Sequence, residues 1–218
     1  MSASSADERP HALALVAAAF CLLVTMSLHP SGAQLLNDYR ATVLKNVVAH
    51  GIALVGIPVS LMGALGIARR LRRKGAGASG DLGGITFLVS NVAVLIAGTA
   101  SGLIAPAIAA RLQLPDPATE ALWRALFRFT GIINQSFAML YVVGLALSVL
   151  VWAIGMWRSV AFPRWLAVVG GLLAAALLSV LVISRAHLDV HTFGLVVLLQ
   201  GAWMLAVAWQ MLRRPASA

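Results

Sequence analysis

The sequence predicts an all-α protein, a membrane bundle of six transmembrane helices with both termini in the cytoplasm. Apolar stretches close to the spanning length of about 20 residues recur along the chain. The chain is 61% hydrophobic and only 11% charged, a balance that excludes an ordinary soluble domain. Because every predicted connection is short, we expect residues 1–218 to form a single integral membrane domain.

Local signals mark where the apolar stretches begin and end. His29-Pro30 closes the first stretch, and the basic run from Arg69 to Lys74 stops the second. Pro163 comes just before the fifth, where proline suits the first turn of a helix. The six spans are predicted at about 11–28, 47–68, 85–110, 129–156, 164–184 and 190–212.

The distribution of basic residues predicts the orientation. Ten of the 16 lysines and arginines fall on the same side of the membrane as the N-terminus and six on the other, and the cytoplasmic side normally carries the excess. The formal charge of +9 therefore reflects topology, and no nucleic-acid partner is expected, because there is no soluble basic domain. The run from Arg69 to Lys74 also suits contact with anionic membrane lipids.

Two segments allow alternative interpretations. Ser31 to Ala33 resembles a signal-peptidase site, and cleavage there would leave five spans, although Asp7 and Glu8 argue against a positive leader. Before the fourth span, Asp116 is a plausible N-cap, and Glu120 precedes an arginine at the favourable helical spacing of four. This second segment is either a short interfacial helix or a simple extension of the fourth span.

Four of the five histidines are predicted near the outer end of the bundle. Ionisable groups at membrane depth are costly and mark functional sites. We assign His29 to the exit of the first span and expect the other three histidines, with a carboxylate in His187-x-Asp189-x-His191, to form an outward-facing pocket. Imidazole and carboxylate suit zinc, copper or iron. One hypothesis is therefore a metal site built from His50, His187, Asp189 and His191.

Two other hypotheses use the same residues. Asp189 is well placed as the N-cap of the last span, which would leave the histidines in the wet interface. His50 and His191 are also candidates for the axial ligands of a non-covalent haem b, since no CxxCH motif for covalent attachment is present.

A fourth hypothesis is a proton-handling or quinone-contacting site, because histidine titrates near neutral pH. Asn91 and Gln200 lie deep in their spans and are expected to make hydrogen bonds between helices. Four further side chains on or near the fourth span are predicted to line the same pocket, and these are Arg128, Asn134, Gln135 and Tyr141.

Small residues predict close helix packing. Gly98-x-x-x-Gly102 in the third span allows two helices to approach closely, either inside the bundle or in a dimer. Pro58 is expected to kink the second span, which also carries three glycines that favour close approach, at positions 56, 63 and 66.

The predicted function is an outward-facing His/Asp pocket that binds a metal, haem or small lipophilic molecule in a redox-linked or sensing role. No catalytic residue is assigned, because nucleotide-binding and hydrolase motifs are absent from the sequence. One alternative is a small transporter or permease with a path along the kinked second span. Another is a non-catalytic membrane subunit of a larger complex. The expected partners are membrane lipids and either a second copy of the chain or a partner membrane subunit.

The last third of the chain carries a resemblance to a known family. Its motifs are Asn134 to Ala138, Trp152 to Arg158, Pro163 to Leu166, and His187 to Gly194 followed by Trp203. Over roughly residues 126–214 the chain resembles a family of small bacterial inner-membrane proteins described only as a domain of unknown function. The resemblance implies a six-span protein of the bacterial inner membrane and implies no activity.

Overall fold

The computed structural model describes residues 8–114, 116–184 and 187–213, and these form helices without strands. Among them, six helical stretches are long and apolar enough to cross a membrane, which confirms the predicted all-α, six-span fold. A short helix, α2 (Gly32–Asn37), lies between the first two stretches. The six are α1 (Arg9–Leu28), α3 (Tyr39–Arg73), α4 (Gly77–Thr99) continued by η2 (Ala100–Ile104) and α5 (Ala105–Arg111), α6 (Pro117–Arg158), α7 (Arg164–Ile183) and α8 (Val190–Arg213).

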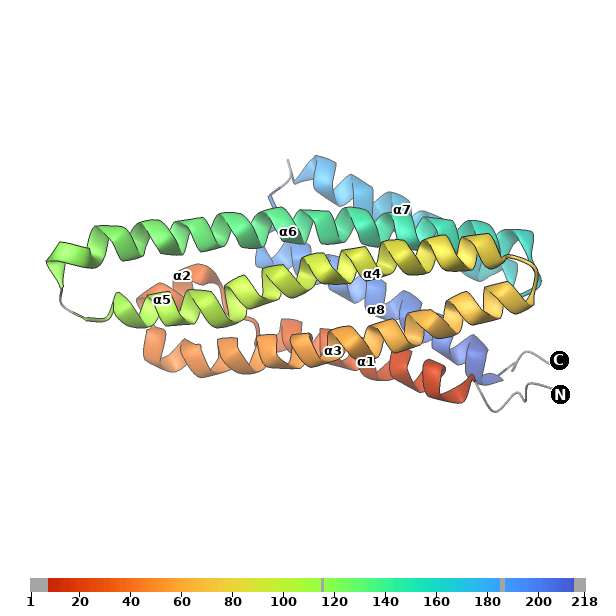
Figure 1. The fold of residues 1–218 in the computed structure, drawn as a ribbon, viewed down its shortest axis with the longest axis horizontal. Coiled ribbons are helices and arrows are strands. Elements are labelled where there is room, and N and C mark those ends of the chain that lie inside the picture. Colours follow the sequence, from red (N-terminus) through yellow and green to blue (C-terminus); the bar gives the residue numbers. More distant parts are fainter. Residues whose placement is uncertain (1–7, 115, 185–186, 214–218) are drawn as a thin grey trace.

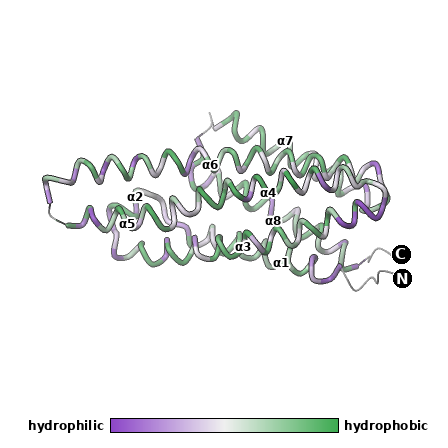
Figure 2. The backbone as a smooth tube through the Cα atoms, viewed as in Figure 1, coloured by the Kyte–Doolittle hydropathy of each residue, from purple (hydrophilic) through white to green (hydrophobic). Residues whose placement is uncertain are grey.

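Three of the helical stretches, those that begin with α3, α4 and α6, are much longer than the predicted spans. At 1.5 Å per residue, the 35 residues of α3 extend about 52 Å and the 42 of α6 about 63 Å, against about 30 Å for the hydrocarbon core. Their ends therefore project beyond the apolar layer. In Figure 2 the more hydrophilic residues gather toward the ends of the long helices, and the middle is mainly hydrophobic.

The six stretches form a ring in which α1 neighbours α3, α3 neighbours α4, α4 neighbours α6 and α6 neighbours α7, while α8 contacts both α1 and α7. The start of α1 and the end of α8 lie at the same end of the bundle, with the α3–α4 and α6–α7 connections (Figure 1). We call this the terminal end. The opposite end holds α2 and α5, and we call it the α2 end.

Glycines let α1 lie directly against α3. A Cβ added at Gly63 would come within 2.5 Å of the Leu15 side chain, and one at Gly56 would come within 2.9 Å of the Cys21 Cβ. No ordinary side chain fits at such a distance, so the glycines permit the close approach. The predicted role of the second-span glycines in packing is confirmed.

Aromatic side chains fill the half of the bundle toward the terminal end. Trp152 of α6 is 1% exposed and stacks on Trp203 of α8 at a ring separation of 6.1 Å. The Phe87 ring of α4 lies 5.3 Å from the same Trp152 ring. A separate small cluster of Leu35, Ala105 and Ala109 joins α2 to α5 at the other end. Between these two packed regions the bundle is hollow.

The segment before the fourth span is part of one continuous helix. Asp116 caps α6 by accepting a hydrogen bond from the backbone N–H of Ala118 at 3.2 Å, as predicted. The Arg124 Nε donates to Glu120 Oε1 at 2.7 Å, which confirms the expected ion pair. Because α6 runs unbroken from Pro117, the extension is confirmed and a separate interfacial helix is not formed.

Candidate functional site

A cavity of about 840 Å³ lies inside the bundle, between α1, α3, α4, α6 and α8, on the side toward α2. Most of its wall is apolar, with side chains contributed by every one of these helices. Pockets that bind small molecules have about this volume and this character. Apolar lining residues include Leu22, Met26, Leu54, Ile57, Val94, Ala97, Phe127, Ile132, Ala138, Phe193 and Val197.

Two histidines meet at the wall of this cavity. His50 of α3 is 4% exposed, and its Nε2 lies 3.1 Å from the Nε2 of His29, which follows the end of α1. The ring centroids are 4.6 Å apart. Sequence reasoning assigned His29 only to the exit of the first span and missed this pairing. The signal available was that both histidines were predicted at one membrane level.

Each of these rings also has a backbone partner. The Nδ1 of His29 lies 2.8 Å from the carbonyl oxygen of Pro30, and the Nδ1 of His50 lies 2.8 Å from that of Asn46. Burial lowers the pKa of His29 below 6.5, although its hydrogen bond to the Pro30 carbonyl opposes the shift. Three short contacts therefore hold both rings in fixed orientations.

The position of His50 depends on close packing against η2. A Cβ added at Gly102 would overlap the Cβ of His50, so the glycine is required for this approach. One helical turn earlier, the Asn46 Nδ2 donates to the Ser101 carbonyl at 3.0 Å. The segment Ala100–Ile104 is a π-helical turn, a feature that often accompanies functional sites. Gly98-x-x-x-Gly102 thus packs inside the bundle, the first of the two roles predicted for it.

Polar side chains at the deep end of the cavity are bonded to one another. The Ser60 hydroxyl donates to the Asn91 Oδ1 at 3.0 Å, and the Asn91 Nδ2 donates to the Phe87 carbonyl at 2.8 Å. The hydroxyl of Tyr141 donates to the side-chain oxygen of Gln200. The predicted interhelical hydrogen bonds of Asn91 and Gln200 are confirmed.

The connection between α7 and α8 is attached to α6 by a side-chain amide. The Gln135 Nε2 donates to the Leu188 carbonyl at 2.7 Å, and the Leu188 N–H donates to the Gln135 Oε1 at 3.1 Å. This pair of bonds satisfies both backbone groups of Leu188, a residue that is 4% exposed. It fixes one wall of the cavity, and the other three predicted pocket residues, Arg128, Asn134 and Tyr141, line the cavity too.

Asp189 has a structural role at the start of α8. Its carboxylate accepts a hydrogen bond from the Thr192 N–H at 2.7 Å, so it is the N-cap suggested by the sequence. This hydrogen bond lowers the pKa of Asp189. His187 and Asp189 are exposed and line the cavity, whereas His191 is exposed and outside the lining.

The residues considered for a metal or a haem are not brought together. Among the described residues, no three His, Cys, Asp or Glu side chains come close enough to hold a metal ion. His50 directs its Nε2 at His29, and His191 is absent from the cavity wall, so the two are not arranged as axial ligands.

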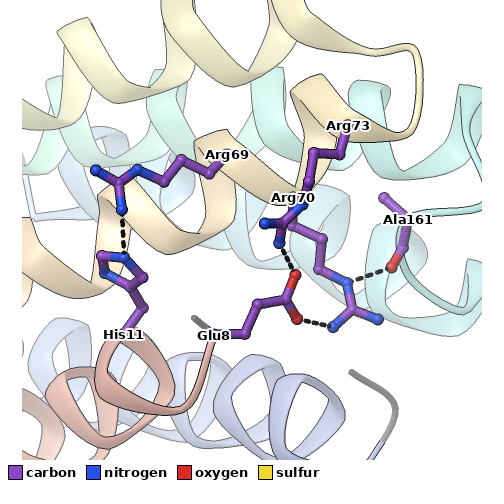
Figure 3. Close-up of polar contacts among 6 residues, drawn as sticks. All are labelled: Glu8, His11, Arg69, Arg70, Arg73 and Ala161. Atoms are coloured by element: carbon purple, nitrogen blue, oxygen red, sulfur yellow. Dashed lines mark hydrogen bonds and ion pairs between the residues drawn. The ribbon is translucent and has the colours of Figure 1, made fainter. Parts of the chain in front are cut away.

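A second polar cluster, which sequence reasoning missed, lies at the terminal end (Figure 3). Glu8 is 3% exposed and pairs with Arg70 at 2.8 Å and also with Arg73. The Arg70 Nε donates to the Ala161 carbonyl at 2.7 Å, and its guanidinium lies 4.7 Å from the Phe162 ring centroid. The start of α1, the end of α3 and the α6–α7 connection are thereby tied together.

The rest of the basic run is also engaged within the chain. Arg69 donates to the Nε2 of His11 at 2.9 Å (Figure 3). The Nδ1 of His11 lies 2.7 Å from the Met62 carbonyl oxygen. Arg72 pairs with Asp81 of α4. The segment predicted as a topology signal or a lipid contact therefore also holds the terminal end of the bundle together.

The fold and the site define a multi-pass membrane protein with an internal cavity. Comparison with protein-family models, with curated proteins and with solved structures found no match to this chain. The resemblance to a bacterial inner-membrane family therefore stays a prediction.

Proposed function

We propose that the protein resides in a bacterial inner membrane, with both termini in the cytoplasm, and binds one small lipophilic molecule in its cavity. The observation that carries this proposal is the cavity of about 840 Å³ with a mostly apolar wall. Such a volume lies within the range of about 300–1,000 Å³ in which proteins enclose small molecules. The apolar wall suits a hydrocarbon chain or ring system.

The polar groups of the wall favour a ligand with a hydrogen-bond-accepting head. At the deep end, Tyr141 and Gln200 satisfy each other. Arg128 and Asn134 also line the cavity, and neither side chain has a hydrogen bond or ion pair with another described residue. Both carry N–H donors. We therefore expect a carboxylate or carbonyl head near these two side chains and an apolar body in the rest of the cavity.

A fluorescent probe tests this proposal. Dansyl-labelled undecanoic acid, added to the protein in lipid nanodiscs, should bind with an emission increase above that of empty nanodiscs. Ala53 of α3 lines the cavity one turn from His50, so Ala53→Trp should fill the space and weaken binding roughly tenfold or more, about 1.4 kcal/mol. Val55→Trp is the matched control, since Val55 is 64% exposed on the same helix and does not line the cavity.

A second variant tests the head group. Arg128→Gln should weaken the binding of the dansyl-labelled acid and leave that of the matching dansyl-labelled alcohol unchanged, because only the acid gains from the guanidinium charge. Equal binding of the acid to the wild type and to Ala53→Trp would contradict a ligand site in the cavity.

A further inference from the structure

The His29–His50 pair has more short contacts than two neutral rings can satisfy. Three contacts join the pair to its surroundings and to itself: Nδ1 of His29 to the Pro30 oxygen, Nε2 to Nε2, and Nδ1 of His50 to the Asn46 oxygen. They measure 2.8, 3.1 and 2.8 Å, all within hydrogen-bond range. A hydrogen bond needs one proton between its two atoms.

Counting protons gives the charge of the pair. A carbonyl oxygen only accepts, so each Nδ1 must carry a proton to bond with its carbonyl. Two neutral imidazoles hold two ring protons in all, and these are then used up at the two Nδ1 atoms. The two Nε2 lone pairs would face each other at 3.1 Å with nothing between them. If either Nδ1 proton moved to the Nε2 of the same ring, that Nδ1 would present its lone pair to a carbonyl oxygen, which is also unfavourable.

We propose that His29 and His50 bind a single proton between their Nε2 atoms, which makes the pair an imidazole–imidazolium cation at the cavity wall. With three protons, every contact of the pair is a hydrogen bond. The proton leaves only with the loss of one of the three contacts, so proton binding and the closed position of the two rings are coupled. This inference does not depend on the proposed ligand.

The three contacts favour the shared proton, whereas the surroundings disfavour charge on the pair. Burial lowers the pKa of His29, so the pair is expected to take up its proton below about pH 6.5. No carboxylate forms an ion pair with either ring among the described residues. The other titratable or charged side chains that line the cavity are Cys21 from α1, Arg128 and Tyr141 from α6, and His187 and Asp189 from the α7–α8 connection, with none from α4 or η2.

Nuclear magnetic resonance of the wild-type protein tests the shared proton without any variant. The protein is labelled with ¹⁵N-histidine, placed in nanodiscs and titrated from about pH 4 to about pH 8, a range that brackets the ordinary histidine pKa. We expect a scalar coupling between two Nε2 nuclei, carried by the N–H···N bond. As the pH rises, both rings should lose this coupling together in a step that releases one proton.

Variants assign the signal. His29→Gln and His50→Gln should each abolish the coupling, and His191→Gln should leave it intact. The proposal is overturned if no Nε2–Nε2 coupling is seen at any pH, or if the two rings take up two protons in separate steps. It is also overturned if a chelator changes the resonances of the pair, because a bound metal ion would then occupy the place of the proton.

Discussion

At the scale of single residues, buried charge imposes the strictest requirements on this molecule. Glu8 is 3% exposed and lies between two arginines, one of which, Arg70, is itself 5% exposed. Removing one partner of a buried ion pair leaves the other charge without compensation, which costs far more than the loss of a surface pair. The cluster of Glu8, Arg70 and Arg73 at the terminal end should therefore contribute strongly to stability.

Glu8→Gln should lower the free energy of unfolding by about 3–5 kcal/mol, because Arg70 would remain buried without a carboxylate. Glu120→Gln is the matched control. It breaks an exposed i,i+4 pair with Arg124 and should change stability by less than about 1 kcal/mol. Thermal unfolding of both variants in the same detergent measures the difference, and equal losses would contradict the importance of burial.

The pH dependence of stability should reflect His29. Its folded pKa is below 6.5, the value expected for the unfolded chain, so the unfolded state binds more protons as the pH falls. This contribution to stability is present above about pH 6.5 and is lost as the pH falls through the folded pKa. Unfolding at a series of pH values should show a decline below about pH 6.5, with a slope of up to about 1.4 kcal/mol per pH unit for one proton.

His29→Gln should reduce that acid-side slope, whereas His191→Gln, which changes an exposed histidine, should leave it unchanged. An identical slope in the wild type and in His29→Gln would show that His29 titrates in the folded protein as it does in the unfolded chain.

At the scale of helices, the contact between α3 and η2 positions the histidine pair. Gly102→Ala should destabilise the protein by about 1–3 kcal/mol and separate His50 from His29, because the added Cβ overlaps the Cβ of His50. Gly98→Ala is the control from the same motif. Its Cβ would lie 3.6 Å from the Leu54 side chain, an ordinary contact, and alanine favours the helix by up to about 1 kcal/mol.

Thermal unfolding and the Nε2–Nε2 coupling are the two measurements for this glycine pair. We expect Gly102→Ala to lower the unfolding temperature and to lose the coupling. Gly98→Ala should retain the wild-type unfolding temperature and the coupling. If the two substitutions behave alike, the close approach at Gly102 does not hold His50 in place.

Features that depend on a single helix were predictable from the sequence, and the pairs of residues that meet between helices were not. Span number and the caps at Asp116 and Asp189 depend on local chemistry, so apolar length and residue type sufficed for them. The pairing of His29 with His50 depends on the rotation of each helix about its axis, which packing sets and spacing does not. The ion pairs of Glu8 could not be predicted for the same reason, since its arginine partners lie 62 and 65 residues away in the sequence and only the packing of α1 against α3 brings them together.

At the scale of the whole molecule, the orientation in the membrane is open to a direct test. Leu114, between α5 and α6, and Val160, between α6 and α7, are 58% and 87% exposed at opposite ends of the bundle. In a Cys21→Ala background, a membrane-impermeant maleimide should label Leu114→Cys in intact spheroplasts and Val160→Cys only after lysis. The reverse pattern would contradict termini in the cytoplasm.

The cavity is the other property of the whole molecule, because five helices build it and no single one encloses it. The cavity lies between the aromatic cluster around Trp152 and the small cluster around Leu35. A ligand that fills this cavity should stabilise the folded protein, since binding to the folded state alone shifts the folding equilibrium.

The most direct test of the central claim is native mass spectrometry of the protein released from the membranes in which it is made. The wild type and Val55→Trp should carry one tightly bound small molecule per chain, of a single mass, and Ala53→Trp should be released without it. A wild-type protein that is bare, or that carries the same adducts as Ala53→Trp, would contradict a ligand in the cavity.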